Sequence, residues 1–195
     1  MFRSLLLGLA LAGSPLLAAT VVLDFEGFPD SIILTNQYAG VTFANASILR
    51  AGISLNEFEF PAHSGINVAS DHGGPMSLNF SSPVQSFGGY FTYAETLTID
   101  AFGIGNTLLG SVTSPFSNNE ALSGAPDSSP NELLQISSLS GISRVIITGD
   151  PAGGSFALDD ATYSTTSATV PEPSSWPLLF SAILILAITR MRKLS

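Results

Sequence analysis

The sequence predicts an all-β protein, with one antiparallel β-sandwich domain between two apolar ends. Short runs rich in Val, Ile, Phe, Thr and Tyr fill residues 20–163, separated by Gly, Pro, Asn, Asp and Ser. That spacing is typical of β-sandwiches and barrels. The longest apolar runs lie at the termini, where we expect an N-terminal signal helix and a C-terminal transmembrane helix.

Strands are predicted where apolar and polar residues alternate, because successive side chains of a strand point to opposite faces. In residues 20–26, Leu23 and Phe25 share one face, while Asp24 and Glu26 share the other. The remaining strands are expected at 40–44, 76–80, 86–93, 97–102, 131–136, 142–148 and 155–163, with turns at 83–86 and 150–154. Residues 131–136 could instead form a helical turn capped by Asn131.

The N-terminal 19 residues have the pattern of a secretory signal peptide. A basic start at Arg3 precedes an apolar stretch and small residues. We expect cleavage after Ala19, and the alternative is an uncleaved membrane anchor.

The C-terminal apolar run, residues 176–189, would form a helix of about 21 Å. A bilayer core is roughly 30 Å thick, and a buried core helix of this length is the alternative. However, a basic stop of Arg190, Arg192 and Lys193 follows at once, and such residues stay on the cytoplasmic side. The sequence therefore predicts a transmembrane helix here, after a polar linker at 164–169.

A short motif lies just ahead of this helix and consists of Val170, Pro171, Glu172 and Pro173. The prolines keep the chain extended and leave the glutamate accessible. The motif, apolar run and basic tip together resemble the PEP-CTERM sorting signal of exported proteins from Gram-negative bacteria that make exopolysaccharide. The resemblance covers residues 170–195 and implies cleavage near the motif by exosortase, a transpeptidase-like membrane enzyme.

The charge of the central domain excludes one class of partner. Between residues 20 and 169 the only bases are Arg50 and Arg144, against fourteen carboxylates, which gives a net charge of −12. Such a field repels nucleic acid and anionic lipid and favours cations, so we expect no nucleic-acid partner. The chain has no cysteine, so no disulfide contributes to its stability.

Two motifs carry a second resemblance, Leu23-Asp-Phe-Glu-Gly27 and Phe156-Ala-Leu-Asp-Asp160. With the order of the strands, they resemble the jelly-roll sandwiches of exported carbohydrate-binding modules. The resemblance implies that the first and last strands lie side by side. It also implies a structural calcium ion held by Glu26, Asp159 and Asp160, and calcium favours such oxygen ligands. The alternative is that the two aspartates are simply hydrated at a strand end.

Other chemistry has weaker support. Tyr90, Phe91 and Tyr93 could stack on sugar rings or pack in the core. His63 precedes Ser64, but a catalytic triad needs contact in space, and the chain has no Gly-x-Ser-x-Gly motif. We therefore expect no enzyme activity.

Together these features predict an exported, non-catalytic surface or extracellular-matrix protein associated with exopolysaccharide. It would pass through an inner-membrane intermediate, with secretion machinery and an exosortase-like enzyme as partners. The alternatives are a calcium-stabilised carbohydrate-binding module and a hydrolase.

Overall fold

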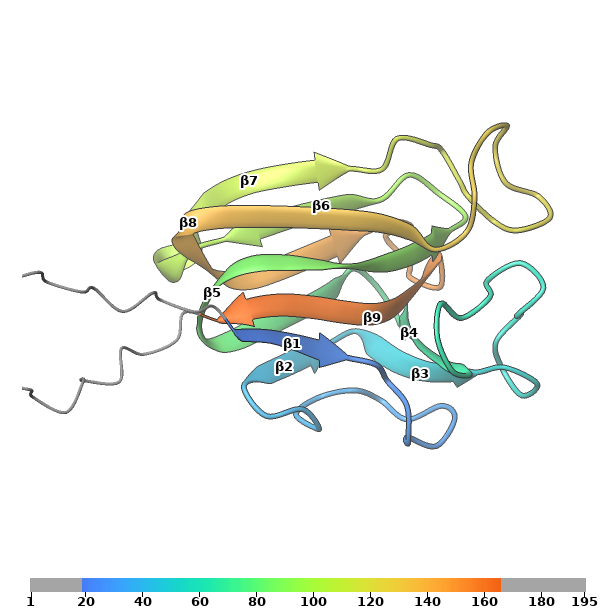
Figure 1. Cartoon of the computed structure of the whole chain (residues 1–195), viewed down its shortest axis with the longest axis horizontal. Helices are drawn as coiled ribbons and strands as arrows, with labels where there is room; N and C mark the ends of the chain where they lie inside the picture. The colour runs from blue at the N-terminus through green and yellow to red at the C-terminus, as the bar shows by residue number, and fades with distance from the viewer. Residues whose placement is uncertain (1–18, 166–195) are drawn as a thin grey trace, which may run out of the picture. The chain divides into compact units, whose positions relative to one another are not determined.

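The structure, a computed structural model, describes residues 19–165 as antiparallel β-strands with one short 3-10 turn (Figure 1). The strands are β1 Ala19–Leu23, β2 Val41–Ala44, β3 Ala46–Arg50, β4 Asn67–Asp71, β5 Met76–Tyr93, β6 Thr98–Phe102, β7 Leu108–Thr113, β8 Glu132–Thr148 and β9 Phe156–Thr165, and the turn is η1 Ile104–Asn106. The all-β, antiparallel part of the prediction is confirmed.

The predicted signal peptide, except its last residue Ala19, and the sorting motif, the transmembrane segment and the basic stop lie outside the described residues. Within residues 19–165, no helix has the length and apolar character needed to cross a bilayer.

The sheet bends through its two longest strands, β5 and β8. The first part of β5 pairs with β2 and with the end of β8, whereas its second part pairs with β9 and with the start of β8. The sheet order is β3-β4-β9-β5-β8-β6-β7, with β1 also on β9 and β2 also on β5. In Figure 1 both long strands turn back at the same end of the domain.

The core consists of the residues that alternation placed inward. Leu23 and Phe25 are 1% and 0% exposed, as expected for one shared face. The inward faces predicted for 40–44 and 76–80 are also buried. The hydrophobic effect of burying these side chains is the main source of stability for a domain without disulfides.

Several predicted boundaries are wrong. The turn expected at 83–86 lies inside β5, which passes Pro83 with shifts of register on either side of Val84. Residues 131–136 and 142–148 belong to one strand, β8, which bends at Gly141 with a φ of 81°. β1 is shorter than expected because Phe25 has a φ of 59°, although its ring remains buried.

Three strands, β3, β4 and β7, were not predicted. All five residues of β4 are buried, although Asn67, Ser70 and Asp71 are polar, so the alternation of apolar and polar residues does not mark this strand.

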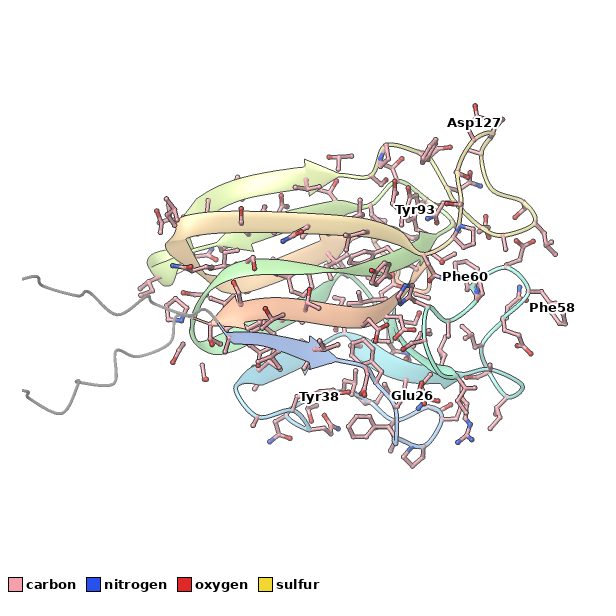
Figure 2. The ribbon with its side chains drawn as sticks, in the orientation of Figure 1. Glu26, Tyr38, Phe58, Phe60, Tyr93 and Asp127 are labelled. Atoms are coloured by element: carbon pink, nitrogen blue, oxygen red, sulfur yellow. The ribbon has the colours of Figure 1, made fainter. Side chains whose placement is uncertain are left out.

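The two ends of the domain differ. Ala19 pairs with Thr165, so the described chain enters and leaves at one end, which we call the exit end. The bends of β5 and β8 and the η1 turn lie at the same end (Figure 1). The opposite end, which we call the loop end, carries the long loops 51–66 and 114–131, with Phe58 and Asp127 near their tips (Figure 2).

Candidate functional site

The expected neighbourhood of the first and last strands is present. β1 pairs with β9, and Leu23 lies opposite Ala161. Asp159 and Asp160, next along β9, therefore lie beside the point where the chain leaves β1. Residues 63–67, which we call the strap, cross this region and enter β4.

A bulge in β9 presents both aspartates to the strap. Tyr90 pairs with Asp159 but Gly88 pairs with Thr162, so β9 has one more residue than β5 in this interval. Asp160 absorbs the irregularity with a φ of 43°, a left-handed conformation in which aspartate is among the more tolerated residues. Gly89 allows the close approach, because a Cβ there would lie 2.5 Å from Leu158 Cδ1.

Asp159 is buried and fixes the start of the strap. It is 1% exposed. Its Oδ2 accepts a hydrogen bond from Ser64 N at 2.8 Å, and its Oδ1 accepts one from Asp160 N at 2.7 Å. Burial raises the pKa of Asp159 to about 6, despite the opposing effect of these backbone N–H donors.

Asp160 holds the same segment through side chains. Its Oδ2 lies 2.7 Å from His63 Nδ1, and its Oδ1 accepts a hydrogen bond from Ser64 Oγ at 3.0 Å. The His63 ring stacks on Tyr90, with ring centroids 3.4 Å apart and an interplanar angle of 8°. The two aspartates and Tyr90 therefore hold one end of the strap.

Glu26 holds the other end. Its Oε1 accepts hydrogen bonds from Ile66 N and Asn67 N, both at 2.8 Å. Gly65, with a φ of 56°, is required because a Cβ at that position would collide with the Glu26 side chain.

Asn67 completes the strap and has one unused acceptor. Its Nδ2 donates to Phe25 O at 3.1 Å and to Phe28 O at 3.0 Å. Its Oδ1 is buried and has no hydrogen-bond partner among residues 19–165. An unpaired buried acceptor is costly, so it marks a place where a donor or a cation would be stabilising.

The three carboxylates expected to share a calcium ion do not converge on one point. Glu26 binds backbone N–H groups at one end of the strap, whereas Asp159 and Asp160 bind the other end. Over residues 19–165, no three His, Cys, Asp or Glu side chains gather as a metal-binding group. The arrangement therefore does not fit a site built from these three carboxylates alone.

The strap does not assemble a Ser-His-Asp triad. Ser64 and His63 both bond to Asp160 and not to each other, so the histidine is not placed to take the proton of the serine. The aromatic run also serves the core, since Phe91 and Tyr93 are 0% exposed. Of these three aromatic residues, Tyr90 is the one that reaches the surface, and the imidazole ring of His63 covers it there.

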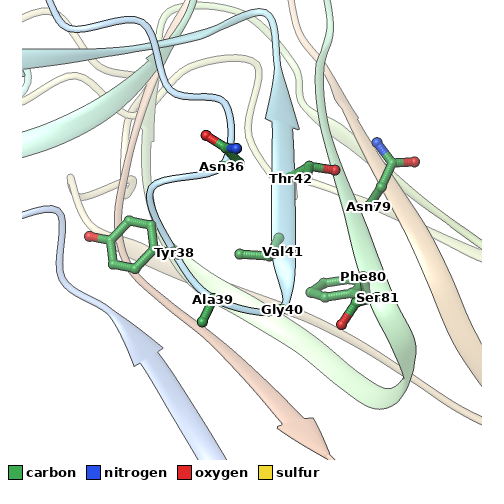
Figure 3. Close-up of a pocket in the computed structure, with 9 residues that line it drawn as sticks. All are labelled: Asn36, Tyr38, Ala39, Gly40, Val41, Thr42, Asn79, Phe80 and Ser81. Atoms are coloured by element: carbon green, nitrogen blue, oxygen red, sulfur yellow. The ribbon is translucent and has the colours of Figure 1, made fainter.

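A separate hollow of about 280 Å³ lies where the segment before β2 meets the paired start of β2 and residues 79–81 of β5 (Figure 3). Its lining residues are Asn36, Tyr38, Ala39, Gly40, Val41, Thr42, Asn79, Phe80 and Ser81. Burial raises the pKa of Tyr38 to about 12, and its Oη accepts a hydrogen bond from Phe25 N at 2.9 Å. Uncharged amides and hydroxyls beside aromatic rings suit a neutral polar ligand. No sequence pattern indicated this hollow, because its uncharged residues come from two segments, 36–42 and 79–81, that are far apart along the chain.

No family model matches the chain, and no curated protein matches it. Among solved structures it is similar to the K2 cleaved adhesin domain of Lys-gingipain, at 13% identity and a TM-score of 0.48 over 75% of this chain and 100% of that one. It is also similar to a DUF4465 family protein from Bacteroides caccae, at 12% identity and a TM-score of 0.46 over 74% and 98% of the two chains. A family 6 carbohydrate-binding module follows at 11% identity and a TM-score of 0.38, over 71% and 95%. These similarities are too low to assign a family or a ligand.

Proposed function

We propose that this chain is an exported, non-catalytic surface or matrix protein whose body is a jelly-roll-like β-sandwich. Its C-terminal segment would hold it in the inner membrane until an exosortase-like enzyme processes it. One observation carries the proposal: Ala19 pairs with Thr165, so both connections to the terminal segments leave from one end of the domain. With this arrangement the terminal segments can lie in a membrane while the long loops at the loop end extend into water.

The polar cluster around the strap supports a non-catalytic role. Its carboxylates are used as acceptors for the strap, and Asp159 is buried away from any substrate. A sandwich is supported by the way β5 and β8 turn back and pair with different strands on their two halves.

Mass spectrometry of the protein recovered from cells and from the medium tests this function. We expect a C-terminus near Pro173 in the processed form. Recovery from the medium with Ser195 intact would contradict processing.

A calcium-stabilised carbohydrate-binding module is the second candidate. The unpartnered Oδ1 of Asn67, whose backbone N–H donates to Glu26, supports a cation near the strap, as does the net charge of −12 between residues 20 and 169. The hollow beside Tyr38 supports a neutral sugar as ligand.

Two measurements test this candidate. Millimolar calcium should raise the melting temperature above its value in a chelator, and Glu26→Gln should abolish the difference. On a glycan array, selective binding that Asn79→Ala removes would establish the hollow as the sugar site. Equal melting temperatures in calcium and in chelator would contradict a bound calcium ion. Failure to bind any glycan on the array would contradict a carbohydrate-binding module.

A further inference from the structure

The exit end has no acidic residue, although the domain as a whole is strongly acidic. The strand ends, bends and turns at this end are residues 19–22, 39–42, 80–86, 103–108, 137–142 and 162–165. None of these segments contains Asp or Glu, so all fourteen carboxylates lie elsewhere on the domain. The negative charge is therefore displaced from the end at which the chain enters and leaves.

The same end exposes large apolar side chains on its turns. Leu139, in the bend of β8, is 95% exposed, and Ile104, in the η1 turn, is 80% exposed. Leu108, at the start of β7, is 56% exposed. A single exposed leucine is ordinary, but three large apolar side chains exposed at one end without carboxylates are available to an apolar partner.

One of the two bases of the domain lies beside this end. Arg144 pairs with Phe102 across β8 and β6, and its guanidinium carbon lies 4.7 Å from the centre of that ring. The guanidinium also donates a hydrogen bond to Asn106 in the η1 turn. The local charge at the exit end is therefore positive or zero.

Hydroxyl groups line a hollow of about 320 Å³ next to Leu139. Its other lining residues are Gln85, Ser86, Ser137, Ser138 and Ser164. Ser86 Oγ and Ser164 Oγ lie 2.7 Å apart, which leaves hydroxyl groups of both strands at the rim. Such groups can donate to the phosphate and ester oxygens of a lipid headgroup.

The net charge of the domain does not prevent this end from approaching an anionic surface. The second half of β5, from Ser86 to Tyr93, separates the two ends by roughly 25 Å. At physiological ionic strength the screening length is about 8 Å, so the carboxylates of the loop end are screened from a surface at the exit end.

The length of chain after β9 limits how far the domain can lie from the apolar segment. Residues 166–175 lie between Thr165 and the apolar segment at 176–189, and ten residues span at most about 35 Å. A bilayer that held the apolar segment would therefore keep the exit end close to its surface, at a high effective concentration.

We propose that the exit end is a membrane-facing surface, with Leu139, Ile104 and Leu108 resting in the headgroup region of a bilayer containing anionic lipid. This inference rests on the proposed function, because the C-terminal segment supplies the tether. Insertion of a few apolar side chains adds to tethering, as in interfacial anchors. The bilayer would thereby fix the orientation of the domain and direct the loop end outward.

The absence of cysteine makes a direct test possible. Three full-length single-cysteine variants, Leu139→Cys, Ile104→Cys and Phe58→Cys, would carry an environment-sensitive fluorophore. They would be reconstituted into vesicles of phosphatidylethanolamine and phosphatidylglycerol with spin-labelled quencher lipid. Phe58 is the matched control, because it is 72% exposed but lies at the loop end (Figure 2).

We expect blue-shifted emission and at least threefold stronger quenching for the probes at 139 and 104 than for the probe at 58. Equal quenching at all three positions overturns the inference. Flotation of the same samples separates the two proposals. A chain that does not float with vesicles contradicts the membrane-held intermediate, whereas a chain that floats with unquenched probes at 139 and 104 contradicts the membrane-facing surface alone.

Discussion

The loop end and the exit end terminate the same strands in different ways. At the loop end, buried polar side chains hold the connections between strands: Asn119, Asp71 and Asp159 are 0%, 3% and 1% exposed. At the exit end the connections are short, and glycines with positive φ shape the turns, as at Gly141 opposite Pro83.

Asp71 illustrates how a buried polar side chain holds the backbone at the loop end. Its Oδ1 accepts hydrogen bonds from Ser155 N and Phe156 N at 2.9 and 3.1 Å, and its Oδ2 accepts one from Ser155 Oγ. Long irregular segments expose many N–H groups that need acceptors, and carboxylates supply them. This contrast between the two ends explains why acidic residues gather where the loops are long. The short connections of the exit end have fewer N–H groups that need an acceptor, so this end can lack acidic residues.

The largest effect is expected from Asn119→Ala at the loop end. The side chain accepts a hydrogen bond from Tyr93 N at 2.6 Å and donates to Phe91 O and Ser129 O, both at 2.9 Å. Its loss leaves the buried Tyr93 N and Phe91 O unpaired and also removes the bond to Ser129 O, so we expect about 3 kcal/mol of destabilisation and a melting temperature about 10 °C lower.

Asn118→Ala is the matched control for this variant. Its two hydrogen bonds are long, at 3.3 Å, so thermal unfolding should shift by no more than about 2 °C. Similar losses for both variants would show that the buried amide does not hold the loop.

A smaller loss is expected from Gly141→Ala at the exit end. This residue has a φ of 81°, and a Cβ would lie 2.9 Å from Pro83 Cβ. We expect destabilisation of about 2 kcal/mol by chemical denaturation.

Gly105→Ala tests the effect of backbone strain without a steric collision of the added Cβ. It has a φ of 74° but no atom within 4 Å of the added Cβ, so we expect only about 1 kcal/mol. If Gly141→Ala proved as mild as Gly105→Ala, close contact would not shape the bend.

The pH dependence of stability tests the buried carboxyl group of Asp159. Its folded pKa of about 6 lies above the unfolded value of about 3.9, so the folded state binds an extra proton between these values. Stability should therefore rise as the pH falls through this window, by about 2 kcal/mol between pH 6.5 and 4.5 in chelator.

Asp159→Asn should remove most of this slope in thermal melts, while Asp127→Asn, in the 114–131 loop, should leave it unchanged. If the pH dependence of stability persists in Asp159→Asn, another ionisable group must cause it. Below pH 4 the trend should weaken, because hydrogen bonds from Ser54 and Ser31 lower the pKa of Asp30, which loses its contribution as it protonates.

The smallest effect on stability is expected from Leu139→Ser. At 95% exposure this side chain has almost no core contact to lose, so the melting temperature in water should stay within about 1 °C. A loss of several degrees would mean that Leu139 supports the bend and is not free to meet a partner.

Sequence alternation was sufficient to find the strands with one solvated face. It identified 40–44 and 76–80 with their inward residues, and residues 155–163 close to the observed β9. It missed β4, which is buried on both faces, and it divided β5 and β8 because Pro83 and Gly141 are residues that usually mark turns.

The candidate site was predictable only in part. The expected pairing of the first and last strands is present and places Asp159 and Asp160 beside the end of β1. The strap was not predictable, because His63 and Ser64 lie far from β9 in sequence and meet it through a bulge that has no local signal. The calcium ligand set stays a prediction.

Hydrogen exchange of the full-length protein, in water and on phosphatidylglycerol-containing vesicles, tests the contrast between the two ends most directly. The account predicts added protection in residues 80–86, 103–108 and 137–142 on vesicles, with no change in the loops 51–66 and 114–131. Protection of those loops, or uniform exchange with and without lipid while the chain stays vesicle-bound, would contradict it.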